Sequence, residues 1–152
     1  VLANHPELTA AFFAFNRHLL YASTLADRDR ELLVLRVAFL RNCAYEWAQH
    51  VPVAVGLGIS PEDVGRVALG PTADGWSAYD RALLTAVDEL HDDGTLSAPT
   101  WQQLAATFDT KQLMDLVFTI GAYDTIALAF NSFGLELDDD LAAYPMPTPR
   151  QR

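Results

Sequence analysis

The chain has 152 residues, of which 51% are apolar, and a formal net charge of −10. This length and composition exclude a disordered chain and predict one compact domain that buries about two-thirds of its unfolded surface. The sequence has 20 acidic and only 10 basic residues, with no Lys/Arg cluster. Such a surface repels a phosphate backbone and an anionic membrane, so we expect neither nucleic acid nor a membrane as partner.

The single cysteine, Cys43, cannot form a disulfide within the chain, which suits a reducing compartment. No secretory pattern opens the numbered chain, whose first residue is Val rather than Met. The longest apolar stretch, 113–130, has about the length of one membrane span. It contains Asp115 and Asp124, each of which costs roughly 2.5–3.5 kcal/mol at a membrane centre. We therefore expect a cytoplasmic protein in which this stretch is a buried helix.

The first part of the chain has the apolar spacing of helices rather than the alternation of strands. Pro6 suits the first position of one helix, and Asp27 can start a second. The second helix is apolar around most of its circumference, so it should lie in the core. A third helix should run from near Cys43 toward Gly56, with Pro52 kinking it or ending it early.

Four further helical segments follow. Ser60 followed by Pro61 is the clearest of their starts, Ser97 can cap another, and Asp109 or Thr110 starts the last. The segments are expected at about 61–69, 77–91, 98–108 and from 109 or 110 to about 133. The end of the chain combines three consecutive Asp residues with three prolines and should be poorly ordered. We therefore predict an all-α fold, with one domain over 1–137 and an acidic, proline-containing tail over 138–152.

A candidate site lies at the start of the third helix. Cys43, Glu46 and His50 stand at i, i+3 and i+7, which places them on one helical face within about 10 Å along the axis. Glu46 and His50 are i, i+4 neighbours that can share a hydrogen bond. Glu31, near the start of the core helix, adds a second carboxylate. These groups can move protons or activate a nucleophile. Their structural alternative is a solvated Glu/His pair beside an inert buried thiol.

The chain resembles the carboxymuconolactone decarboxylase / alkylhydroperoxidase-D (AhpD)-like family in one stretch. This stretch consists of Glu31, the eleven residues that follow it and the pattern Cys-x-Tyr-Glu-Trp-x-x-His over 43–50. The family pattern is a Glu, eleven residues and then Cys-x-x-Cys-x-x-x-His. The resemblance implies an AhpD-like helical domain with an antiparallel helix core. Here Glu46 replaces the second cysteine. Because a disulfide-forming peroxidase needs two neighbouring thiols, a two-cysteine peroxidase is excluded.

We predict an enzyme that performs cofactor-independent acid–base catalysis on a small organic molecule, by decarboxylase-, lactone- or enol-type chemistry. His50 is the expected proton shuttle, Glu46 its acid/base partner and Glu31 the residue that orients the pair or accepts the proton. Two close carboxyl groups disfavour joint ionisation, so one should stay protonated near neutral pH. Cys43 is the fourth expected catalytic residue, as a group in the pocket wall. The expected substrate-binding residues are Tyr45, Arg36, Tyr123 and Asn131.

Two other functions remain open. Cys43 could serve a one-cysteine peroxidase, with Glu46 and His50 promoting the thiolate and an outside thiol resolving the sulfenic acid. A non-catalytic oligomeric interaction domain would be favoured by a motif helix without a cavity. No metal is expected, because carboxylate bundles use Glu-x-x-His and the spacing here is Glu-x-x-x-His.

We also expect a homo-oligomer, because several helices are apolar nearly all round and a monomer of this size has few places to bury them. The resemblance implies the same, with pockets often near subunit contacts. The sequence does not distinguish a dimer from a trimer or a hexamer.

Overall fold

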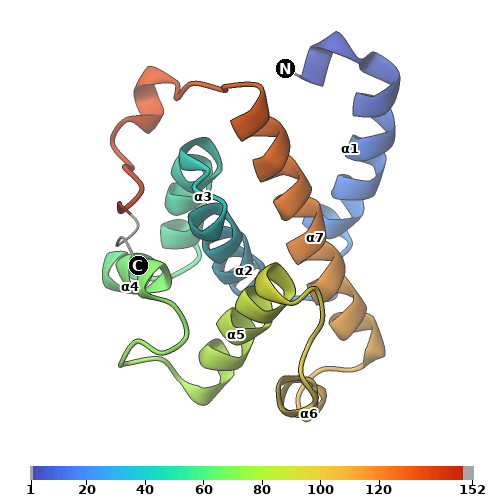
Figure 1. The fold of residues 1–152 in the computed structure, drawn as a ribbon, viewed down its shortest axis with the longest axis vertical. Coiled ribbons are helices and arrows are strands. Elements are labelled where there is room, and N and C mark those ends of the chain that lie inside the picture. The colour runs from blue at the N-terminus through green and yellow to red at the C-terminus, as the bar shows by residue number, and fades with distance from the viewer. Residues whose placement is uncertain (1, 149–152) are drawn as a thin grey trace.

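The computed structural model describes residues 2–148, which form seven α-helices, two short 3-10 helices and no strand (Figure 1). The all-α, AhpD-like fold expected from the sequence is confirmed. In chain order the elements are η1 (Leu2–Asn4), α1 (Pro6–Tyr21), α2 (Asp27–Leu40), α3 (Ala44–Gly56), α4 (Pro61–Leu69), α5 (Ala78–Asp92), α6 (Ala98–Ala105), α7 (Thr110–Ser132) and η2 (Asp139–Leu141).

Helix α2 is the centre of the domain. Every residue from Asp29 to Ala38 is buried, and the helix packs against α3, α5 and α7. Burial on all sides is what an apolar circumference predicts, and it confirms the expected place of this helix in the core. The buried stretch also carries Arg30, Glu31 and Arg36. Since a buried charge is costly without a partner, these side chains determine which polar groups the neighbouring helices must provide.

A tight turn joins α2 to α3 and positions the motif helix. Asn42 adopts a left-handed backbone conformation with φ of 52°, and the N–H of Cys43 donates to the carbonyl of Ala38 at 2.8 Å. Cys43 is the N-cap residue, one position before the helix. Helix α3 continues to Gly56, the end expected from the sequence, so Pro52 does not end it early, one of the two effects considered for this proline. Val51 and Ala54 on either side of the proline are buried, and this packing holds the helix together around it.

Helix α7 is long and apolar enough to span a membrane, by length and composition alone. In the domain it packs against α1, α2 and α6, with Leu116 and Ile120 in the core. Asp115 is buried there, where it accepts hydrogen bonds from the backbone and hydroxyl of Thr24 and pairs with His18 at 2.9 Å. The cytoplasmic location expected from the sequence stays a prediction.

Helix α1 lies along α7 at one side of the molecule, away from α4 and α5 (Figure 1). Only Asn16 and Leu19 of its 16 residues are buried. Phe15 meets Phe118 of α7 edge-on, with the ring centroids 6.1 Å apart. The helix therefore covers α7 with one edge and leaves much of its apolar surface exposed.

Two segments differ from the sequence-based expectation. Helix α6 ends at Ala105 rather than near Phe108, which instead turns inward and is buried. The end of the chain was expected to be poorly ordered from residue 138, yet Leu141 is buried, and Tyr144 and Met146 pack against the core. These apolar side chains, placed among the acids and prolines, hold the segment against the domain. Pro149 lies outside the described residues.

Candidate functional site

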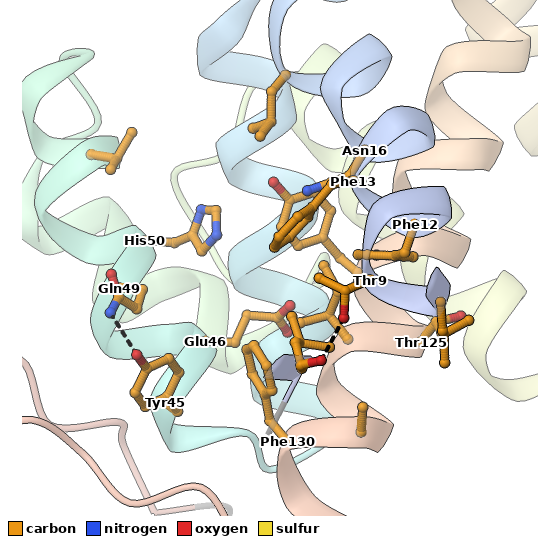
Figure 2. Close-up of a pocket in the computed structure, with 17 residues that line it drawn as sticks. Thr9, Phe12, Phe13, Asn16, Tyr45, Glu46, Gln49, His50, Thr125 and Phe130 are labelled. Atoms are coloured by element: carbon orange, nitrogen blue, oxygen red, sulfur yellow. Dashed lines mark hydrogen bonds between the residues drawn. The ribbon is translucent and has the colours of Figure 1, made fainter. Parts of the chain in front are cut away.

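A cavity of about 540 Å³ lies between α1, α3 and α7 (Figure 2). Its wall is mainly apolar, with a small polar group contributed by α1 and α3. The aromatic members are Phe12, Phe13, Tyr45, Tyr123 and Phe130, and the polar ones include Thr9, Asn16, Glu46, Gln49 and His50. Among the described residues, none that lines the cavity is Lys or Arg. The cavity therefore suits an uncharged guest, because an anion that entered it would lose its hydration and would find no Lys or Arg to pair with among these described lining residues.

His50 lines the cavity and is held in place by Glu31 of α2, which lies behind it in the core. The imidazole Nδ1 lies 2.7 Å from Oε2 of Glu31, and that carboxylate is 1% exposed. The Nε of Arg30 donates to the other oxygen, Oε1, at 3.2 Å. Because the guanidinium of Arg30 donates to the same carboxylate, we assign its oxygens as acceptors, so that Nδ1 of His50 donates to Glu31. In the neutral form of the ring, Nε2 then holds the lone pair. The ring of Tyr123 meets that of His50 edge-on at 5.1 Å and restrains its orientation.

Glu46 shares the cavity but not this hydrogen bond. Its carboxyl group is 2% exposed, and neither oxygen has a hydrogen-bond partner among the described residues. Burial raises the pKa of Glu46 to about 9, and the nearby negative charge of Asp124 adds to the shift. Glu46 is therefore a neutral carboxylic acid at pH 7. The expected Glu46–His50 hydrogen bond is wrong, because Glu31 from the neighbouring helix occupies Nδ1 and Glu46 extends toward the cavity instead (Figure 2).

Cys43 does not line the cavity, so the expectation that it contributes to the pocket wall is wrong. Its side chain is fully buried at the start of α3. Burial raises the pKa of the thiol, although the backbone N–H groups of Tyr45 and Glu46 act in the opposite direction. Cys43 leaves the helical face of Glu46 and His50 because it caps the helix rather than belonging to it.

Two of the four expected substrate-binding residues lie in the cavity wall. Tyr45 lines it, with its hydroxyl accepting from Gln49 at 3.1 Å and donating to Asp138 at 3.3 Å. Tyr123 lines it beside His50, and burial, followed by the charge of Glu31, raises the pKa of its hydroxyl. Both phenols are thus held in place by contacts within the protein.

The other two, Arg36 and Asn131, do not line this cavity, so the structure does not bring them to the candidate site. Arg36 is buried on the far side of α2 from the cavity, where its guanidinium donates to both oxygens of Asp88 and to the carbonyl of Val67. Asn131 donates to the carbonyl of Arg41 at 2.7 Å and ties the end of α7 to the turn after α2. Both side chains satisfy structural needs that arise only once the helices are packed.

The residues that α1 contributes to the cavity wall were not expected from the sequence. Phe12, Phe13 and Asn16 of this helix form the side of the cavity that faces α3 (Figure 2). The Oδ1 atom of Asn16 is buried without a hydrogen-bond partner. The available signal was an amide within an otherwise apolar helical face. Among residues 2–148, no three His, Cys, Asp or Glu side chains are grouped closely enough to hold a metal ion.

Comparison with known proteins places this geometry in a family. Residues 6–89, more than half of the chain, match the carboxymuconolactone decarboxylase family. The chain belongs to that family. No curated protein matches it in sequence.

Solved structures share the fold at low sequence identity. A protein of unknown function from Agrobacterium tumefaciens, related to the antioxidant defence protein AhpD, is 22% identical with a TM-score of 0.80, covering 90% of this chain and 94% of that one. The AhpD core of a peroxidase-related protein from Ralstonia eutropha JMP134 is 21% identical, with a TM-score of 0.81 and coverage of 92% and 75%. The debrominase Bmp8, in complex with 2,3,4-tribromopyrrole, is 12% identical, with a TM-score of 0.79 and coverage of 93% and 76%.

The neutral state of Glu46 predicts a pH-dependent effect of Glu46→Gln. The unfolded carboxyl group loses its proton near pH 4.5, whereas the folded one keeps it to about pH 9. Between these values the folded state binds more protons, so wild-type stability falls as pH rises, by about 1.4 kcal/mol per pH unit. The variant lacks this loss, and its advantage should grow by roughly 3 kcal/mol between pH 4.5 and pH 7. Urea unfolding at both pH values measures this.

Glu136→Gln, which changes an exposed carboxylate, is the matched control and should show no comparable growth. A Glu46→Gln advantage that stays constant with pH would show that this carboxyl group ionises normally in the folded protein.

The burial of Cys43 predicts a slow thiol. At pH 8, a disulfide reagent that releases a coloured thiolate should label the folded chain at least about 100-fold more slowly than the chain in denaturant, because labelling requires an exposed thiolate. Labelling of the folded protein at the rate of the unfolded chain would mean that the thiol is open to solvent, and would revive the redox alternative.

Proposed function

We propose that this protein is an enzyme that transfers protons on a neutral, largely apolar small molecule by acid–base catalysis without a cofactor. The observation that supports this most strongly is that an oriented imidazole and a buried neutral acid line the same cavity. The carboxyl group of Glu31 holds His50 at 2.7 Å, while burial keeps Glu46 protonated. Proton transfer at neutral pH requires one group that can accept a proton and one that can donate it, and different surroundings give the two groups different pKa values.

His50 is the proposed base. Because Nδ1–H donates to Glu31, Nε2 can accept a proton from a carbon next to a carbonyl group of the substrate. The electron pair of that C–H bond becomes the C=C bond of an enol, and the carbonyl π pair moves to oxygen. Glu46 donates its hydrogen to this oxygen, and the carboxylate of Glu31 stabilises the imidazolium. In a β,γ-unsaturated substrate the product of this step is a dienol, whose γ carbon takes the proton back from His50. The enol O–H proton returns to Glu46 as the carbonyl group re-forms, which completes an isomerisation and restores both residues.

The side chains that line the cavity favour some of the reaction types expected from the sequence over others. A carboxylate substrate would face Glu46 and an apolar wall in which none of the described lining residues is Lys or Arg. Lactone- or enol-type chemistry on an uncharged compound is therefore preferred to decarboxylation. The complex of the debrominase Bmp8 with tribromopyrrole shows that a protein of this fold can hold a small ring compound.

The two alternatives receive less support. A one-cysteine peroxidase needs an accessible thiolate, and Cys43 is fully buried, outside the cavity wall, with a raised pKa. A purely interacting domain does not account for a cavity into which a neutral acid and an oriented imidazole both extend.

We further propose that the chain forms a homo-oligomer through α7. Five of its exposed residues make one straight stripe at spacings of four, three, four and three, the spacing of helices that pair along their length. The stripe comprises Met114, Phe118, Gly121, Thr125 and Leu128. Its two ends, Met114 and Leu128, each lie seven residues from Gly121, where an added Cβ would meet nothing within 4 Å. An antiparallel second copy would therefore bring Met114 against the partner's Leu128, and the two backbones could approach closely at the glycine.

Removing the base should abolish turnover. In D2O, wild-type protein should accelerate deuterium uptake into neutral cyclic β,γ-unsaturated ketones or lactones, followed by NMR. His50→Ala should reduce this rate by about 10²–10⁴-fold, the usual contribution of a general base. Glu46→Gln should reduce it by at least about tenfold, since the amide is a weaker donor to the developing oxyanion.

Cys43→Ser and His91→Ala are the controls and should keep wild-type rates. Full activity of both His50→Ala and Glu46→Gln would refute the mechanism, and loss of activity in Cys43→Ser alone would favour thiol chemistry.

Disrupting the α7 stripe should change the mass in solution. Light scattering after size exclusion should give the wild type a multiple of 16.7 kDa. Phe118→Glu places a charge at the centre of the stripe and should shift the mass toward the monomer. Trp101→Glu, at a comparably exposed aromatic residue of α6, should leave the mass unchanged. A monomeric wild type at tens of micromolar would contradict the α7 contact.

A further inference from the structure

Asn16 is a buried amide without a partner. It lies on α1 in the cavity wall, is 9% exposed, and its Oδ1 atom accepts no hydrogen bond from the described residues. Buried polar side-chain atoms in proteins are nearly always hydrogen-bonded, to protein or to another molecule. An orphaned acceptor in a cavity wall therefore points to a donor that the cavity itself receives.

Glu46 is the second such group, and it reaches the same cavity from the other side. Asn16 comes from α1 and Glu46 from α3 (Figure 2). Asn16 also carries N–H donors on Nδ2, but its unpartnered buried atom, Oδ1, can only accept, whereas the neutral carboxyl group of Glu46 can donate. A guest that satisfies both has one hydrogen-bond donor and one acceptor.

The remaining wall defines the body of that guest. Phe12, Phe13 and Phe130 present aromatic surface to the cavity. Aromatic walls pack best against a flat or apolar ring, and they leave the hydroxyl groups of a sugar-like guest unpaired. Thr9, Tyr45, Gln49 and Thr125 also line the cavity, but each already makes a hydrogen bond within the protein. The buried polar atoms left for the guest to satisfy are therefore those of Asn16 and Glu46.

We propose that Asn16 is a specificity-determining residue which accepts a hydrogen bond from an O–H or N–H group of the substrate. The substrate is then a neutral ring compound that carries a carbonyl-type acceptor for Glu46 and a hydroxyl or N–H donor for Asn16. The proposal rests on the proposed function in taking this cavity as the active site. It concerns binding, so it can be tested separately from turnover.

Three probes that differ at one position test this with the full chain at pH 7. 2-Naphthol carries the donor, 2-methoxynaphthalene lacks it, and 2-naphthoate replaces it with a negative charge. By fluorescence titration, 2-naphthol should bind about tenfold more tightly than the methyl ether, the ratio typical of one buried hydrogen bond. 2-Naphthoate should bind at least about tenfold more weakly than 2-naphthol, since none of the described residues that line the cavity is Lys or Arg.

Asn16→Leu keeps the size of the side chain and removes the acceptor. The variant should bind 2-naphthol about tenfold more weakly and should bind the ether at least as well as the wild type does. Thr9→Val is the matched control, because the hydroxyl of Thr9 also lies in the cavity wall but donates to the carbonyl of Leu2. It should preserve the wild-type ratio. Circular dichroism and the binding of the ether establish that each variant is folded.

Equal affinity of the wild type for 2-naphthol and its ether, failure to bind either, or an unchanged ratio in Asn16→Leu overturns the role of Asn16. His50→Ala separates this result from the proposed function. It should lose turnover and keep the binding ratio. If the ratio follows Asn16 while His50→Ala remains active, acid–base catalysis fails and the recognition by Asn16 stands.

Discussion

The structure depends on one buried carboxylate. Glu31 lies in the central helix at 1% exposure, and its two oxygens are bound by Arg30 on one side and His50 on the other. A charge at this depth is tolerated only when it is paired and hydrogen-bonded. The need to satisfy it fixes α3 against α2 and turns the imidazole of His50 so that its second nitrogen is available to the cavity. The packing of the core and the orientation of the base therefore have the same cause.

Glu46 shows how environment separates two carboxyl groups of the same kind. Glu31 has a guanidinium and an imidazole beside it, whereas Glu46 has no hydrogen-bond partner among the described residues and faces mainly apolar surface. Burial without a compensating charge favours the neutral form, which is why the pKa of Glu46 rises to about 9. The cavity wall thus combines a protonated carboxyl group with an imidazole that Glu31 orients from the core, a division of roles that suits proton transfer. The cost is a loss of protein stability at neutral pH, because the interior holds Glu46 in its neutral form although the group would ionise in the unfolded chain.

Helix α1 connects the site with the outer surface. It closes one side of the cavity through Phe12, Phe13 and Asn16, yet only two of its residues are buried. Phe15 continues the contact to Phe118, which stands in the exposed stripe of α7. A second copy seated on that stripe would cover apolar surface next to the cavity. In this arrangement self-association and enclosure of the substrate are linked, because α7 contributes to both.

The sequence by itself determined the helices and the composition of the site. Periodicity and caps at Ser60, Ser77, Ser97 and Asp109 act within a few residues, so they can be read locally. The spacing of Glu31, Cys43, Glu46 and His50 identified the two helices that carry the site. Tertiary structure decided which of these groups meet. It paired His50 with Glu31 instead of Glu46, withdrew Cys43 into the core, assigned Arg36 to Asp88, and brought Asn16 to the cavity from a helix distant in the chain. Those outcomes depend on the relative placement of packed helices and on which buried polar atoms they leave to satisfy, and neither is encoded in spacing along one helix.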